Sequence, residues 1–378
     1  MSTPAFHLEF REKVNLGSFY TSEEYVDLVW EFIEPFVDGN TVVLDPACGY
    51  GAFLRKQTLA QKIGNDIDRE ALKTAKSKIR DAEFLNLNAL EHPDRKAYGV
   101  KKDQKLIVIG NPPYNDTTSQ AKKKLKSVNF RVDGRLKARD IGISFLKLFY
   151  YLRADYVCVL HPLSFLIKRA NFNLLKGFKE SYRLRESLII SSRVFHGTSR
   201  TSEFPIIIAL YESNIRGMTY DYVRNYPFKT VEGKTFKLSD FDYVSNYVKK
   251  YPAKGERFGE GDVLFYTLRD INALRRNRTF LEKPTRNALR VDPSKLDFYL
   301  YIDVFKDFCE HVPYYLNNLD VIIDLELFSR FKPFFVSYAL RKHPFLRKFY
   351  SQESFTEDRE KLKEYFKALL GEHFCENS

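Results

Sequence analysis

The chain has 378 residues, of which 44% are hydrophobic, and a formal net charge of +12 at pH 7. This length suggests two domains with sizeable cores, and the positive charge fits a polyanionic partner. The apolar runs are far too short to span a membrane and the amino terminus lacks a signal-peptide core, so we expect a cytoplasmic protein without a membrane anchor. The four cysteines lie too far apart for zinc pairs, which predicts reduced thiols and no metal site.

The charge is unevenly distributed along the chain. Residues 1–110 carry 15 Lys and Arg against 17 Asp and Glu, so this part is close to neutral. The remaining residues carry 46 Lys and Arg against 32 Asp and Glu. The basicity therefore lies after residue 110.

Strands and helix-length segments alternate over the first 212 residues. Thr21 and Glu24 have the spacing of a capping box, and an amphipathic helix is expected from there to about Phe36. Strands are expected near residues 41–44, 62–65, 83–87, 106–109, 156–161, 187–190 and 204–211. This pattern predicts an α/β fold with a mostly parallel sheet, helices on both faces and an antiparallel strand at 204–211.

A glycine-containing loop follows the first predicted strand. Asp45 ends this strand, and Gly49 and Gly51 permit a tight bend and a close backbone approach to a ligand. The segment 52–54 is expected to open a helix whose amino end favours a carboxylate. The second strand ends in Asp66, and an acid at this place binds a ribose diol in dinucleotide-binding folds.

The most informative motif is Asn111-Pro112-Pro113-Tyr114, directly after the buried strand 106–109. The two prolines fix the backbone, so the Asn111 side chain and the Pro112 carbonyl become two neighbouring acceptors. Such a pair can hold both hydrogens of one amino group and aim its lone pair at an electrophile, without an acid, a base or a metal. Tyr114 offers a flat face for a planar base, worth roughly 1–3 kcal/mol in stacking.

Two cofactors compete for this loop. A glycine loop and a ribose-binding acid also occur in nicotinamide-dependent enzymes, but the third glycine of that fingerprint is absent here. An Asn-Pro-Pro-Tyr strand end has no role in hydride transfer. S-adenosyl-L-methionine is therefore the favoured cofactor.

The first 212 residues resemble the adenine-N6 DNA methyltransferases of the gamma arrangement, typical of restriction–modification systems. The resemblance includes the order of the parts: a helix start at Gly17-Ser18-Phe19-Tyr20-Thr21, the glycine loop, the tetrapeptide and a C-terminal region. It implies a seven-stranded Rossmann-like methyltransferase sheet, catalysis by the tetrapeptide and the following cofactor roles. Thr21 and Ala47 would face the methionine carboxylate, and Asp45 would face the methionine amino group. Asp66 would face the ribose and Ile67 the adenine ring. Asn88 stands where the family places an aspartate that accepts from the adenine amino group.

The same resemblance implies roles in holding the target. Asn111 and Pro112 would accept from the target amine and Tyr114 would stack on the flipped base. Phe195 is the candidate for the second aromatic of this sandwich and Phe204 is its competitor, although either can be an ordinary core aromatic. A basic segment after Tyr114 can clamp DNA phosphates or be a solvated surface; its residues include Lys122, Lys123, Lys124, Lys126, Arg131 and Arg135.

The alternation of strands and helices ends near Ser213. We therefore expect an S-adenosylmethionine-binding catalytic domain at 1–212 and a DNA target-recognition domain, rich in helices from Leu296 onward, at 213–378. Glu232-Gly233-Lys234 loosely matches a metal-nuclease motif but is more simply a hairpin turn.

These features predict a site-specific methyltransferase for the N6 amino group of adenine in double-stranded DNA, flipped from the stack. A separate restriction endonuclease is its expected partner. Two rivals keep the chemistry and change the acceptor to RNA or to a protein glutamine amide. A third rival is a catalytically inert DNA-binding specificity subunit.

Overall fold

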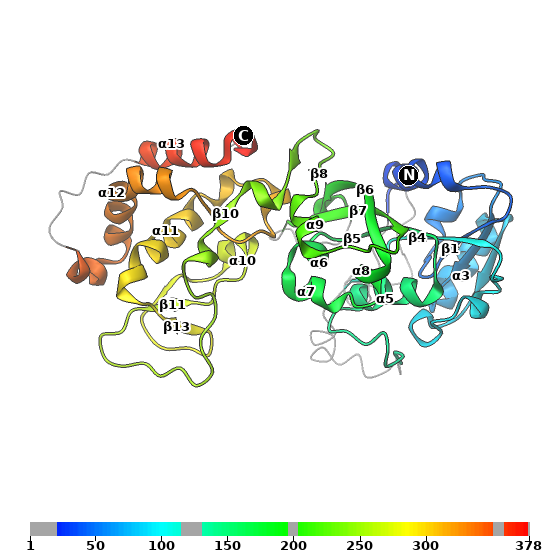
Figure 1. The fold of residues 1–378 in the computed structure, drawn as a ribbon, viewed down its shortest axis with the longest axis horizontal. Coiled ribbons are helices and arrows are strands. Elements are labelled where there is room, and N and C mark those ends of the chain that lie inside the picture. The colour runs from blue at the N-terminus through cyan, green and yellow to red at the C-terminus, as the bar shows by residue number, and fades with distance from the viewer. Residues whose placement is uncertain (1–20, 115–130, 196–202, 351–358, 377–378) are drawn as a thin grey trace. The chain divides into compact units, whose positions relative to one another are not determined.

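A computed structural model describes residues 21–114, 131–195, 203–350 and 359–376. The chain divides into two compact units, Met1–Thr235 and Phe236–Ser378 (Figure 1). The first unit is built on a seven-stranded sheet with the order β3-β2-β1-β4-β5-β7-β6. Its strands, β1 to β7, are Thr41–Asp45, Gln61–Asn65, Ala82–Leu85, Lys105–Gly110, Tyr156–Pro162, Tyr182–Ser191 and Pro205–Ser213.

The sheet confirms the predicted α/β fold class. The five strands β1 to β5 pair in parallel, and β7 runs antiparallel to both β5 and β6. The central strands read as apolar runs in the sequence because both of their faces are covered: every residue of β1 is buried, and so are the last five of β4. The edge strand β3 is only half-buried, which explains its weaker pattern.

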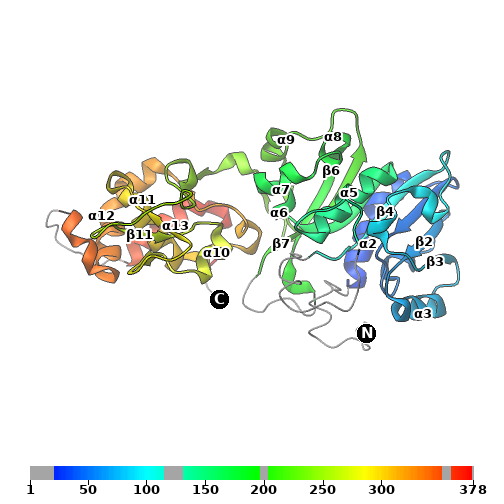
Figure 2. The same ribbon diagram turned by 90° about the horizontal axis from the view of Figure 1, so that it is seen from below.

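Helices connect and cover the strands. In chain order they are α2 (Glu23–Ile33), α3 (Arg69–Lys78), α5 (Ile141–Leu152), α6 (Ser164–Ile167), α7 (Arg169–Leu174), α8 (Phe178–Ser181) and α9 (Tyr220–Asn225). Helix α3 lies beside the edge strand β3 (Figure 2) and begins at Asp68, whose carboxylate accepts from the amides of Glu70 and Ala71. Helix α5 begins in the same way at Asp140 and carries an almost wholly buried sequence.

The predicted capping box at Thr21 and Glu24 is wrong. Helix α2 begins one residue later than predicted, with Ser22 as its N-cap, and no side chain caps it. The Thr21 hydroxyl instead accepts from the Asn111 side chain. A long-range contact thus replaces the local one.

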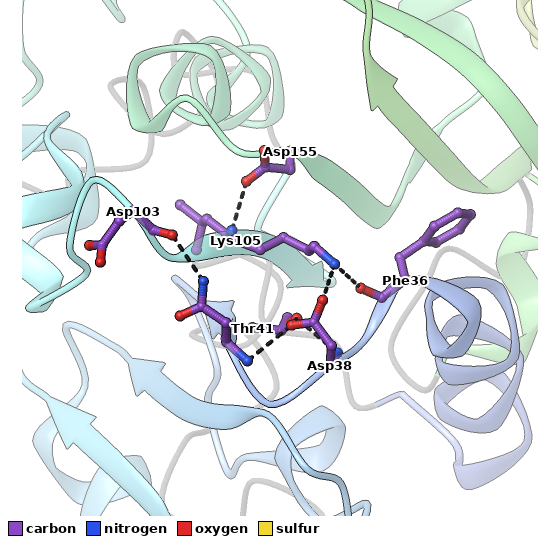
Figure 3. A network of polar contacts seen from close by, with 8 residues as sticks. Phe36, Asp38, Thr41, Asp103, Lys105 and Asp155 are labelled. Carbon is purple, nitrogen blue, oxygen red and sulfur yellow. Dashed lines mark hydrogen bonds and ion pairs between the residues drawn. The ribbon is translucent and has the colours of Figure 1, made fainter.

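A polar network fixes the amino ends of β1 and β4 (Figure 3). Lys105 Nζ donates to the Phe36 carbonyl at 3.0 Å and to the Asp38 carboxylate, and this hydrogen bond holds the pKa of Asp38 below its usual range. Asp38 also accepts from the Thr41 hydroxyl at 2.9 Å, and Asp155 accepts from the Leu106 amide at 2.8 Å. The edge of the sheet opposite the carboxyl ends is therefore held by side chains as well as by the β-ladder.

The compact units divide 23 residues later than the boundary expected from the sequence, between Thr235 and Phe236. Residues well beyond 212 still contact the edge strand β6: the Tyr222 hydroxyl of α9 donates to the Leu184 carbonyl at 2.6 Å, and the Val231 amide donates to the Ile189 carbonyl at 3.0 Å. Gly233, with φ +80°, lies in the turn between β8 (Phe228–Lys229) and β9 (Thr235–Phe236), which confirms the expected hairpin.

In the described part of the second unit, four α-helices combine with two small sheets. The helices are α10 (Ile271–Arg276), α11 (Leu296–Asp307), α12 (Leu325–Lys342) and α13 (Arg359–Leu370). The sheets pair β10 (Asp242–Tyr243) with β14 (Ile322–Ile323), and β11 (Leu264–Tyr266) with β12 (Phe280–Leu281) and β13 (Ala288–Arg290).

Aromatic side chains form the core of this second unit. Tyr301 of α11 stacks on Phe335 of α12 with centroids 5.1 Å apart, and its hydroxyl accepts from Tyr365 of α13 at 3.1 Å. Phe308 stacks on Phe366 at 4.7 Å. The aromatic residues of the C-terminal helices are therefore largely core residues. Among the residues that the structure describes, no helix is long and apolar enough to cross a membrane.

Candidate active site

The predicted site residues meet at one edge of the sheet. Asp45 ends β1, Asp66 follows β2, Asn88 lies beyond β3, and Asn111 follows β4. Because these four strands are parallel, their carboxyl ends lie at the same edge. The structure thus brings together side chains that are up to 66 positions apart in the sequence.

The glycine loop is shaped by two left-handed residues and one acid. Gly49 has φ +50° and its amide donates to Asp66 Oδ2 at 2.7 Å. Gly51 has φ +75°, and a Cβ atom there would lie 2.7 Å from Ile79 Cδ1. The loop therefore depends on glycine at both positions.

The helix expected after this loop is a single 3-10 turn, Ala52–Leu54. At its end, the Leu54 carbonyl accepts from the buried ammonium of Lys62 at 2.8 Å. Lys62 also donates to the Lys56 carbonyl at 3.0 Å and pairs with Asp81 at 2.7 Å. A lysine inside a strand thus caps the turn beside the glycine loop.

Asp66 and Ile67 form the second loop of the site. The Asp66 carboxylate accepts from the amides of Gly49 and Asp68, at 2.7 and 2.8 Å, and burial raises its pKa. Ile67 is 46% exposed, which is unusual for an isoleucine. A fixed acid next to an exposed apolar side chain fits a ribose with a planar base.

Asp45 is a buried carboxyl with an unfavourable environment for its charge. Burial raises its pKa to about 8, and the nearby Asp66 adds to this effect, while one hydrogen bond from the Ala47 amide at 3.2 Å opposes it. Gly110 approaches the same carboxyl so closely that a Cβ atom would lie 2.6 Å from Asp45 Oδ1. A cation placed beside Asp45 would restore its ionised form.

The tetrapeptide directly follows β4. The Asn111 side chain donates from Nδ2 to the Thr21 hydroxyl at 3.2 Å. Its other end, Oδ1, is buried and accepts no hydrogen bond from the residues that the structure describes. A buried acceptor without a donor is costly, by about 1–3 kcal/mol, and marks a place for a ligand donor.

Tyr114 lies under the start of helix α5. Tyr114 is 7% exposed, and a Cβ added at Gly142 would lie only 2.9 Å from the Tyr114 Cβ. The same added Cβ would lie 2.7 Å from the ring of Phe165. The absence of a side chain at Gly142 therefore makes room for Tyr114.

The two candidates for the second stacking aromatic differ in burial. Phe195 is 1% exposed and packs against Tyr25 of α2 with ring centroids 6.5 Å apart. Phe204 is half-buried, and its amide and carbonyl bond to Ser192. A stacking role for Phe195 thus requires its ring to leave the core.

Asn88 caps a 3-10 turn. Its Oδ1 accepts from the Leu90 amide at 3.2 Å, and its Nδ2 donates to the Arg131 carbonyl at 2.7 Å. The Asn88 carboxamide oxygen thus already accepts one hydrogen bond from the backbone, and its second lone pair is available to a ligand donor.

The basic segment is only partly described. Lys122, Lys123, Lys124 and Lys126 lie outside the described residues, and Arg131 is exposed. Arg135 is exposed and pairs with Asp133 at 2.8 Å, which lowers the pKa of Asp133 to about 2. The pairing uses Nε and Nη2 of Arg135, so the exposed guanidinium keeps Nη1 donors for a phosphate.

Asn65, a residue that the sequence analysis did not assign to the site, joins the glycine loop to the segment after β3. This fully buried side chain donates to the carbonyls of Pro46 and Leu87, at 3.0 and 3.1 Å, and accepts from the Leu87 amide at 3.0 Å. The one available signal was a polar residue at the end of a buried strand.

Sheet and site together define a class of protein. An order of β3-β2-β1-β4-β5-β7-β6 with an antiparallel β7 is the Rossmann-like methyltransferase sheet. Residues 8–156 match the model of the N-6 DNA Methylase family. The predicted resemblance and the predicted cofactor are confirmed, because methyltransferases of this family use S-adenosyl-L-methionine.

The solved structures that align with this chain are distant in sequence. One is the modification subunit of a proposed type I restriction enzyme from Vibrio vulnificus, with 14% identity, a TM-score of 0.41, and coverage of 82% of this chain and 59% of that one. Another is a proposed class I S-adenosylmethionine-dependent methyltransferase from Listeria monocytogenes, with 13% identity, a TM-score of 0.38, and coverage of 58% and 67%. A proposed RNA methyltransferase from Pyrococcus horikoshii has 14% identity, a TM-score of 0.36, and coverage of 53% and 89%. No curated protein sequence matches the chain.

Proposed function

We propose that this methyltransferase transfers the methyl group of S-adenosylmethionine to the N6 amino group of an adenine flipped out of double-stranded DNA, as the modification enzyme of a restriction–modification system. The observation that carries the proposal is the buried Oδ1 of Asn111 at the carboxyl end of β4, which accepts no hydrogen bond from any residue that the structure describes. It offers a fixed acceptor to an amino group, next to the carbonyl of Pro112.

The tetrapeptide works by positioning. Asn111 Oδ1 and the Pro112 carbonyl accept the two hydrogens of the amine, which turns the nitrogen lone pair out of the plane of the base. Pro113 keeps the backbone of this acceptor pair rigid, and Tyr114 contacts the face of the base. The cofactor supplies an electrophilic methyl group when it is bound.

The residues of the glycine loop and its neighbours suit this cofactor. Asp45 would hold the methionine ammonium, and Thr21 and Ala47 its carboxylate. Gly49 and Gly51 allow the backbone to approach. Asp66 would hold the ribose and Ile67 would cover the adenine, whose amino group would reach Asn88.

The charge distribution supports a nucleic-acid substrate bound at the first unit. Residues 111–235 carry 22 Lys and Arg against 10 Asp and Glu, whereas residues 236–378 carry 24 against 22. Two of these arginines lie over tyrosine rings of α9: Arg183 is 3.9 Å from the Tyr222 centroid and Arg169 is 4.4 Å from that of Tyr220. We therefore assign phosphate contacts to the first unit, and target recognition to the nearly neutral second unit.

The test is expression in a methylation-deficient host, followed by modification-sensitive sequencing of the host DNA. We expect N6-methyladenine at one short sequence with the parent chain and none with Asn111→Ala, while calorimetry shows similar cofactor affinity for both. Methylation of DNA by Asn111→Ala would remove this residue from the reaction.

Two other outcomes would favour the rivals. Methylation of RNA or of a glutamine peptide, with DNA unmodified, would move the acceptor to another molecule. DNA binding without any cofactor binding would make the chain a specificity subunit. Copurification with a nuclease encoded in the same system would identify the expected partner.

A further inference from the structure

Thr21 and Asn111 are far apart in the sequence but form one hydrogen-bonded pair. They lie 90 positions apart, and Nδ2 of Asn111 donates to Oγ1 of Thr21 at 3.2 Å. Thr21 is buried and Asn111 is half-buried, so the bond is largely shielded from water. The pair joins the residue proposed for the cofactor carboxylate to the residue proposed for the target amine.

A carboxamide has two ends of similar shape and opposite function. Its oxygen accepts and its NH₂ donates, and a half-turn about the last side-chain bond exchanges them. If Asn111 presented its NH₂ group to the target, two donors would face each other and the amine would be repelled. Something must therefore fix the orientation of this amide before the target arrives.

The Thr21 hydroxyl can fix this orientation. It accepts from Nδ2, which leaves Oδ1 at the opposite end, buried and without a donor among the described residues. A hydroxyl that accepts one hydrogen bond can donate its own proton to another group. A carboxylate would take that proton and leave the oxygen lone pairs for Nδ2, because a carboxylate only accepts.

We propose that Thr21 is a positioning residue that holds the Asn111 carboxamide with its oxygen toward the target amine, and that the carboxylate of the bound cofactor completes this arrangement. The inference deepens the proposed function and rests on it. Cofactor binding thereby prepares the amine acceptor, since the chain of donors runs from Asn111 through Thr21 to the carboxylate.

The test compares Thr21→Val, which removes the hydroxyl but keeps the shape, with Thr21→Ser, which keeps the hydroxyl. Unmethylated plasmid DNA is the substrate, and single-turnover methyl transfer is measured at saturating cofactor. We expect Thr21→Val to lose about tenfold to a hundredfold in rate, as positioning defects do, and Thr21→Ser to stay within about twofold of the parent. Ser22→Ala is the matched control, because this neighbouring hydroxyl makes no capping bond.

The rate at saturating cofactor separates this role from simple cofactor binding. A residue that only binds the carboxylate would raise the KM for the cofactor and leave the saturated rate unchanged, and that result with Thr21→Val would overturn the proposal. An equal loss in Thr21→Ser and Thr21→Val would also overturn it. Thr21→Ala provides a second removal of the hydroxyl if the valine variant does not fold. A parent chain that binds cofactor but methylates no DNA would instead count against the proposed function.

Discussion

Gly110 should be intolerant of any side chain, and the structure gives the size of the effect. Its φ of +136° is a conformation that only glycine adopts readily, so Gly110→Ala should cost about 1–3 kcal/mol in backbone strain. The new Cβ would also lie 2.6 Å from Oδ1 and 3.0 Å from Cγ of the buried Asp45, and relief of such overpacking costs about 1–3 kcal/mol more. We expect a loss of about 2–6 kcal/mol in the free energy of unfolding, with weaker cofactor binding.

Urea unfolding followed by tryptophan fluorescence reports the stability of the first compact unit, in which Gly110 lies. The chain has one tryptophan, Trp30, which is buried in α2 and donates to the Phe53 carbonyl beside the glycine loop at 2.8 Å. Two alanine controls separate the two costs. Gly99 has φ +73° and no atom near the position of a Cβ, so Gly99→Ala should lower the free energy of unfolding by about 1 kcal/mol through backbone strain alone. Gly39 has neither a positive φ nor a close neighbour, so Gly39→Ala should change it by less than about 0.5 kcal/mol. Equal losses at Gly110 and Gly99 would refute the contact with Asp45.

Three further predictions follow from buried side chains. Asp45 has a pKa of about 8 in the free protein, so at pH 6.5 cofactor binding should release a proton; calorimetry in buffers of different ionisation enthalpy would detect it, and Asp45→Asn should abolish it. Because this pKa is raised on folding, the stabilisation that it brings at acid pH is lost as the pH rises from about 4 to 8, and the Asp45→Asn variant should lack this dependence. Lys62→Met should lower the free energy of unfolding by about 2–3 kcal/mol, since two backbone carbonyls lose their donor. Asp81→Asn should lower it by less, because the Asp81 side chain is half-exposed. Equal losses in the two variants would contradict this reasoning. Phe195→Ala should destabilise the first unit by about 3–5 kcal/mol, as truncation of a fully buried phenylalanine does, and Phe204→Ala should destabilise it by less. The fluorescence of 2-aminopurine at the target position reports base flipping. If only Phe204→Ala reduces this fluorescence, Phe204 is the stacking residue.

The sheet was predictable because its strands are covered on both faces. Runs such as Leu106 to Ile109 have no polar alternation, and the observed β4 extends the predicted strand by one residue at each end. The strand β6 was predicted only at residues 187–190 but begins at Tyr182. Its first half alternates buried and exposed residues and contains a bulge at Leu184 and Glu186, which obscured the pattern.

The residues that support the site were harder to predict than those that form it. Asn111 and Gly49 belong to local motifs, so their meaning is visible in the sequence. Lys62 and Asn65 act on carbonyls and amides of segments up to 22 positions away, and no local pattern records such partners. The roles of the motif residues remain predictions that the variants above would test.

The position of α9 has a practical consequence for dissecting this chain. A fragment that stopped at 212 would strip Leu184 and Ile189 of β6 of the partners that Tyr222 and Val231 provide. It would also uncover the buried Val223 and Phe228. A recombinant methyltransferase module, or a chimaera that exchanges the C-terminal part for that of another enzyme, should therefore keep α9 and the β8–β9 hairpin, which ends at Phe236.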